Sequence, residues 1–176
     1  MKRIFGIAFF ATLLACHPSE KKSSEKNDTL QKDSLKANNE VAIKDQKKNK
    51  IFTEYVGLKD ALVKADAKLV QKNAAELQKS LADYDGCEPT AEVAGKIATT
   101  GNLVDQRKSF TILSADLIAL MKNAEIEKGT IYVQHCPMAN KGDGGDWLST
   151  EKEIRNPYYG DEMLECGRVT EELKAK

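Results

Sequence analysis

Five side chains with soft or borderline donor atoms gather near the end of the chain. His135, Cys136 and Met138 stand in the run Gln-His-Cys-Pro-Met, and Met163 and Cys166 stand in Met-Leu-Glu-Cys-Gly. Of the four Met residues in the chain, two lie beside a Cys of this group. Thiolates and thioethers select soft metals such as Cu(I), and imidazole also suits copper. The clustering therefore predicts a Cu(I) site in which Cys136 and Met163 are the preferred ligands, followed by Cys166, Met138 and His135.

The two cysteines of this group allow three interpretations. In an exported protein the oxidising compartment makes a disulfide the default for two nearby Cys. A Cys136–Cys166 disulfide would close a loop of about thirty residues, worth roughly 3–4 kcal/mol on the chain-entropy model. The alternatives are a thiolate metal site, in redox exchange with that disulfide, and two inert buried thiols. Three Cys remain beyond Cys16, so at least one of them has no disulfide partner within a monomer. We expect this unpaired thiol to be Cys87, although Cys87 could instead pair and leave Cys136 or Cys166 free.

The methionines and the histidine also have purely structural interpretations. Met138 and Met163 could fill gaps in the core, which is the usual role of Met. His135 could be a hydrogen-bonded structural residue beside a strand end. Neighbouring residues of a strand point to opposite faces, so His135 and Cys136 need not reach the same ion.

The first residues predict export and lipidation. A short basic start is followed by an apolar stretch over residues 4–15 that is too short to span a bilayer. It ends in Leu13-Leu14-Ala15-Cys16, which resembles a bacterial lipobox. We therefore expect a signal peptide over residues 1–15 and a lipid on Cys16 that anchors the protein to a membrane. An ordinary signal peptide cut nearby, with Cys16 incidental, is the alternative.

The mature chain is predicted to consist of a tether and one domain. Residues 16–50 contain no aromatic side chain beyond His17 and are mostly polar or charged, so we expect a disordered tether. Residues 51–176 have the length of one ordinary domain. The chain has 27 basic and 27 acidic residues, a balance that argues against nucleic-acid binding, which favours a basic face.

The domain is predicted to be mainly α, an up-down four-helix bundle. Apolar residues recur at helical spacing in four segments joined by short loops: residues about 51–64, a helix capped by Asp66, a helix opened by Pro89 and ended by Gly101-Asn102, and a helix through Phe110, Leu113, Leu117 and Leu120 to about Asn123.

A small two-stranded β element and a long loop are expected after the bundle. Residues 130–134 alternate as a strand does, residues 140–146 hold three Gly and read as a loop, and residues 163–169 could form the second strand. We expect the last residues to form a frayed helix. Antiparallel pairing of the two strands would bring Cys136 and Cys166 close together.

Four motifs follow the bundle in a fixed order: Gln-His-Cys-Pro-Met-Ala, Asp-Trp-Leu-Ser, Glu-Ile-Arg-Asn-Pro-Tyr-Tyr-Gly and Met-Leu-Glu-Cys-Gly. With them, residues about 51–170 resemble a bacterial envelope domain of unknown function. That domain is found in lipoproteins and attached to periplasmic adaptor subunits of heavy-metal efflux systems. The resemblance implies copper handling in the envelope. It supplies no catalytic residues; the positions that carry over are His135, Cys136, Met138, Met163 and Cys166.

These observations predict an envelope lipoprotein, facing the periplasm, that binds or passes Cu(I) to or near a metal-efflux adaptor. The alternative is a metal-free interaction module stapled by a Cys136–Cys166 disulfide. We do not expect an enzyme. The chain shows no Ser-His-Asp arrangement and no Cys-x-x-Cys pair, and His135 is too close along the backbone to serve readily as a base for Cys136.

Overall fold

The computed structural model describes residues 40–175, and every structural statement below concerns that part of the chain. The predicted signal peptide, Cys16 and most of the predicted tether lie outside the described residues. The four expected helices are present and follow one another along the chain. They are α1 (Gln46–Val63), α2 (Ala67–Ala82), α3 (Glu88–Thr99) and α4 (Leu103–Lys122). The mainly α fold is confirmed.

Three of the helices begin at a side chain that caps them. Asp45 and Asn102 each accept two free backbone N–H groups in the first turns of α1 and α4, and Asp66 accepts that of Leu69 in α2. The predicted cap at Asp66 is confirmed. Helix α3 has Cys87 at the capping position without a side-chain hydrogen bond, and Pro89 occupies its first turn.

The first regular elements begin earlier than the apolar pattern predicted. Helix α1 starts at Gln46 instead of about residue 51, and strand β1 (Ala42–Ile43) precedes it. Strand β1 pairs antiparallel with β2 (Ile126–Lys128) directly after α4. The first helix was predicted to start too late because residues 46–50 are polar. Their helix is specified by the Asp45 cap, which an apolar period does not reveal.

The sheet that follows β2 in the chain has three strands, so the prediction of a two-stranded element was wrong. Strands β3 (Thr130–Cys136), β4 (Gly145–Ser149) and β5 (Arg168–Lys174) form an antiparallel sheet in the order β4-β3-β5. Strand β4 begins inside the predicted Gly-rich loop. The second strand falls later than predicted, over the expected C-terminal helix, and residues 163–166 form a turn instead. Strand β4 is short and begins with Gly, and β5 is rich in charged residues. Neither shows the regular alternation of apolar and polar residues by which a strand is recognised from sequence.

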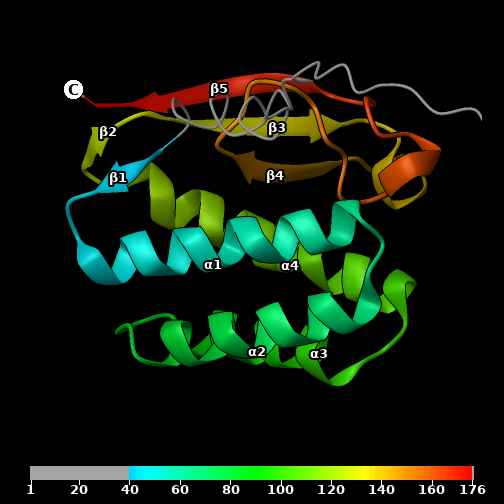
Figure 1. Cartoon of the computed structure of the whole chain (residues 1–176), viewed down its shortest axis with the longest axis horizontal. Coiled ribbons are helices and arrows are strands. Elements are labelled where there is room, and N and C mark those ends of the chain that lie inside the picture. The colour runs from blue at the N-terminus through cyan, green and yellow to red at the C-terminus, as the bar shows by residue number, and fades with distance from the viewer. Residues whose placement is uncertain (1–39, 176) are drawn as a thin grey trace, which may run out of the picture. The chain divides into compact units, whose positions relative to one another are not determined.

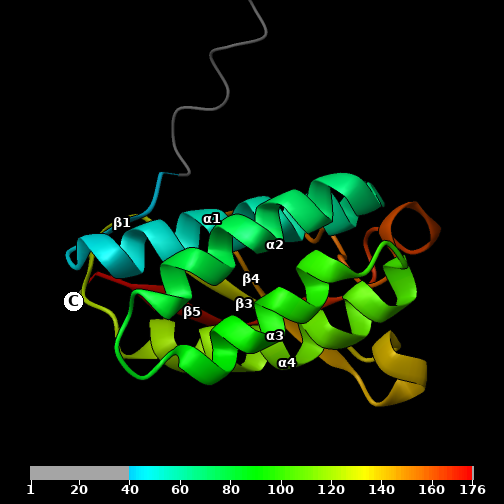
Figure 2. The same ribbon diagram turned by 90° about the horizontal axis from the view of Figure 1, so that it is seen from below.

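The helices and the sheet form layers. Each helix packs against the next one, and α4 and α1 contact strand β4. Figure 1 shows the sheet above α1 and α4, with α2 and α3 on the side away from the sheet. Figure 2, seen from below, shows the helices in front of the strands. Among the described residues, no helix is long and apolar enough to cross a membrane.

Aromatic side chains fill the contact between the helices and the sheet. Tyr55 of α1 stacks on Phe110 of α4 at 5.5 Å between ring centroids. Tyr158 packs between Phe110, at 5.8 Å, and Trp147 of β4, at 6.1 Å. The hydroxyl of Tyr55 lies 2.7 Å from that of Ser114 and accepts the backbone N–H of Leu148 at 3.2 Å. Full burial raises the pKa of Tyr55 far above its usual value.

Replacing Tyr55 by Phe removes the only side-chain hydroxyl that bonds the backbone of β4 to α1 among the described residues. We expect Tyr55→Phe to lower the free energy of unfolding by about 1–3 kcal/mol, because Leu148 and Ser114 keep buried polar groups without a partner. Urea denaturation measures the change. Tyr84→Phe is the control, since its hydroxyl donates to Asp45 at the surface, and its cost should stay below about 0.5 kcal/mol. Equal costs would contradict the prediction.

Candidate functional site

The structure brings Cys136 and Cys166 together. Their sulfur atoms lie 2.7 Å apart although the residues are 30 positions apart in sequence. Cys136 is the last residue of β3 and its side chain has no exposed surface. Cys166 precedes β5 and is only partly buried against the core. The predicted proximity is therefore confirmed, through the pairing of β3 with β5.

Cys166 is held in place by a turn and by a buried amide. Its backbone N–H donates to the carbonyl of Met163 at 3.1 Å, which closes the turn over residues 163–166. Its carbonyl accepts the side-chain N–H of Asn156 at 3.0 Å. Asn156 is fully buried, and its amide oxygen accepts the N–H of Tyr158 at 2.8 Å. One amide therefore ties the Cys166 turn to the segment that carries Tyr158.

Two glycines allow the close approaches around the pair. A Cβ at Gly145, which lies opposite Cys136 on β4, would come within 2.7 Å of the Tyr158 ring. A Cβ at Gly167 would come within 2.9 Å of the His135 carbonyl and 3.0 Å of the Trp147 ring. Real Cβ atoms do not come this near to other heavy atoms, so a side chain at either position would displace a strand or an aromatic ring.

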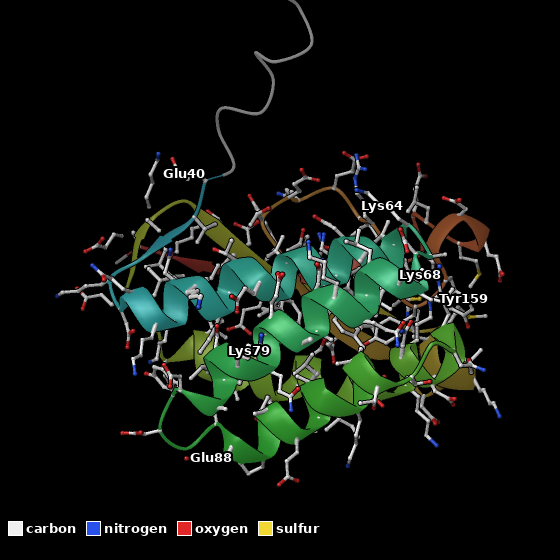
Figure 3. The ribbon with its side chains drawn as sticks, turned by 60° about the horizontal axis from the view of Figure 1, so that its bottom comes forward. Glu40, Lys64, Lys68, Lys79, Glu88 and Tyr159 are labelled. Atoms are coloured by element: carbon white, nitrogen blue, oxygen red, sulfur yellow. The ribbon has the colours of Figure 1, made fainter. Side chains whose placement is uncertain are left out.

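Both methionines of the predicted site belong to the turns that carry the cysteines. Met138 follows Cys136 by two residues, and its carbonyl accepts the hydroxyl of Tyr159 at 2.6 Å. Its side chain is 55% exposed. Met163 begins the turn that ends at Cys166 and is half-buried. Figure 3 shows Tyr159 at the end of the molecule where Lys64 and Lys68 lie.

The side chain of His135 is hydrogen-bonded on the face of β3 opposite to that of Cys136. Its Nδ1 atom lies 2.9 Å from a carboxylate oxygen of Asp146, the residue directly opposite it on β4. His135 and Cys136 are neighbours in β3 and so point to opposite faces of the sheet. The ligand role predicted for His135 gains no support from this geometry.

The thiols differ in their surroundings. The pKa of Cys166 is raised, first because its thiol is hydrogen-bonded to Cys136 and then by burial, while a hydrogen bond from the Met138 backbone N–H opposes the rise. Cys87 lies at the start of α3, apart from the pair in sequence. Burial, assisted by the nearby carboxylates of Glu88 and Asp116, raises its pKa. Both effects favour the protonated thiols at neutral pH.

The site contains residues that the sequence interpretation did not single out. Asn156 donates to the carbonyl of Cys166, and the Trp147 ring lies against Gly167, next to Cys166. The Asn-Pro dipeptide could have indicated the role of Asn156, because an Asn side chain in a turn often hydrogen-bonds nearby backbone groups. Within residues 40–175, no three His, Cys, Asp or Glu side chains are grouped so as to hold a metal ion.

Residues 51–129 match the model of a family described as "Protein of unknown function (DUF3347)". The match begins inside α1, covers α2, α3, α4 and β2, and ends just before β3. A DUF3347 domain is therefore found in this chain, and the Cys pair follows it. Searches of the curated proteins and of the solved structures found no match.

Removing the Asn156 amide should loosen the site. We expect Asn156→Ala to lower the free energy of unfolding of the reduced protein by about 1–3 kcal/mol, because two backbone groups lose a buried partner. Urea denaturation measures it. Asn123→Ala is the matched control, since the Asn123 amide donates to a backbone carbonyl at an exposed helix end. A loss no larger than that of the control would show that Asn156 does not hold the Cys166 turn.

Proposed function

We propose that the protein binds a soft metal ion, Cu(I), through Cys136 and Cys166. The observation that carries the proposal is the 2.7 Å approach of the two sulfur atoms from distant parts of the sequence. Two thiols at this separation need only small movements to bind one ion between them. Copper–sulfur and zinc–sulfur bonds are near 2.3 Å, so the sulfur atoms must move apart when an ion enters.

The donor set favours a soft ion. The turns of the two cysteines also carry Met138 and Met163, whose thioethers are the nearest soft donors along the chain. Thiolate and thioether ligands together select Cu(I) over harder ions. Met138, two residues after Cys136, is exposed, so an incoming ion or a donor protein can reach its thioether. His135 is left out of this ligand set, because it is the neighbour of Cys136 in β3 and points to the opposite face of the sheet.

The cellular setting is part of the same proposal. The lipobox-like sequence ending at Cys16 supports a lipid anchor, and the described domain would then face the periplasm. The resemblance of the C-terminal motifs to domains attached to efflux adaptor subunits supports a partner in metal export. In this role the protein would bind Cu(I) or pass it on and would catalyse no reaction.

A Cu(I) titration tests the proposal directly. We expect the full-length chain, reduced and kept free of oxygen, to take one Cu(I) ion from the chelator bicinchoninate. Cys136→Ser and Cys166→Ser should each weaken binding by at least about tenfold, or 1.4 kcal/mol, since each removes a thiolate. Met138→Leu and Met163→Leu should weaken it by a smaller factor. The fluorescence of Trp147, the only Trp in the chain, gives a second readout beside the site.

Two substitutions away from the pair serve as controls. Cys87→Ser removes a thiol at the start of α3, and Met121→Leu replaces a fully buried Met of α4. Both should keep the affinity of the unaltered protein. Failure of the folded, reduced protein to compete for Cu(I) would refute metal binding, and an equal loss in the control variants would move the site elsewhere.

The second candidate function is a metal-free interaction module in which Cys136 and Cys166 form a disulfide. It is favoured by large apolar side chains that are exposed in the described part of the chain, as a partner surface requires. Ile112 of α4 is 57% exposed and Met138 is 55% exposed. A hydrogen bond of 3.2 Å joins Thr111 of α4 to Asn140, so the segment that follows Cys136 contacts this helix. A folded, reduced protein that binds no Cu(I) would leave this function standing.

A further inference from the structure

Access to solvent distinguishes the two thiols of the pair. The side chain of Cys136 has no exposed surface, whereas Cys166 is only partly buried. Thiol–disulfide exchange begins with a thiolate that a reagent can reach, and its second step needs only a neighbouring thiol. We propose that the pair exchanges with low-molecular-weight disulfides in a fixed order, with Cys166 as the entry thiol and Cys136 as the resolving thiol.

The exchange consists of two balanced steps. The Cys166 thiolate attacks one sulfur of a disulfide such as glutathione disulfide and forms a mixed disulfide, and the first glutathione leaves as a thiolate. The Cys136 thiolate then attacks the Cys166 sulfur, forms the Cys136–Cys166 bond and releases the second glutathione. Each protein thiol gives up its proton and each departing thiolate takes one. The protein is oxidised by two electrons, and the glutathione disulfide is reduced.

The surroundings of each thiol support this order. Cys166 is the last residue of the turn over residues 163–166 and is only partly buried, so a reagent in solution can reach its sulfur. Cys136 is enclosed by the layer that contains Ala139 and Tyr158, both buried. Because Cys136 cannot meet a reagent in solution but lies 2.7 Å from the Cys166 sulfur, its natural target is a bond formed at Cys166.

Trapping of the mixed disulfide tests the order. The full-length chain carrying Cys16→Ser and Cys87→Ser keeps only the pair, and it is reduced and then exposed to glutathione disulfide. With both thiols present, mass spectrometry should find the internal disulfide and no retained glutathione. The further change Cys136→Ser should leave one glutathione on Cys166. In the Cys166→Ser variant, glutathione should add to Cys136 at least about tenfold more slowly than it adds to Cys166 in the Cys136→Ser variant, as expected for an inert buried thiol.

Denatured protein is the control for intrinsic reactivity. In urea, the Cys136→Ser and Cys166→Ser variants should react at similar rates, because the order arises from burial in the fold. Circular dichroism of the native variants confirms that each one folds. Equal rates in the two folded variants, or a glutathione retained when both thiols are present, would overturn the proposal. Cys136 reacting faster than Cys166 would also overturn it.

The exchange sets a redox condition on metal binding, a consequence that rests on the proposed function. A closed disulfide has no thiolate to offer, so oxidised protein should lose Cu(I) binding and regain it after reduction. The two proposals fail separately. Reduced protein that closes the disulfide in the stated order without binding Cu(I) would refute the metal function alone. Reduced protein that binds Cu(I) but reacts in another order would refute the exchange proposal alone.

Discussion

The aromatic contact between helices and sheet is the constraint on which the rest of the structure depends. Tyr55, Phe110, Tyr158 and Trp147 form one continuous set of rings from α1 to β4. The Tyr158 hydroxyl also donates to the carbonyl of Asp146 at 2.9 Å. An isolated two-stranded hairpin is at best marginal in water, and a small sheet becomes stable through further strands with a hydrophobic face or through packing against helices. The same rings therefore hold both the sheet and the strand that ends in Cys136.

The Cys pair is a product of that packing. Cys136 is fixed by the register of β3 between two antiparallel neighbours, and Cys166 is fixed by a turn anchored on Asn156. Neither thiol lies on a flexible segment of its own. A site held from both sides keeps two thiols close whether they are reduced, bonded to each other or binding a soft ion. This common geometry makes metal binding and redox exchange compatible uses of one pair.

Periodicity predicted the helices because their apolar faces are buried against one another. Leu58, Leu77, Leu113 and Leu117 are all fully buried, and each belongs to a segment with helical spacing. The same approach missed the polar start of α1 and the strands β4 and β5. In those segments a cap, or pairing with a neighbouring strand, replaces the apolar pattern as the cause of the structure. The residues of a short strand do not by themselves specify which other strand it will pair with.

For the site, the sequence determined which donors exist and that they cluster along the chain: two thiols, two thioethers and one imidazole within a short C-terminal stretch. Only the tertiary structure decided which of them meet. Strand alternation and Asp146 turned His135 away from Cys136, and the Asn156 anchor placed Cys166 beside it. The physical reason is that residue chemistry is local, whereas the distance between two sulfur atoms 30 positions apart depends on packing and strand register throughout the domain.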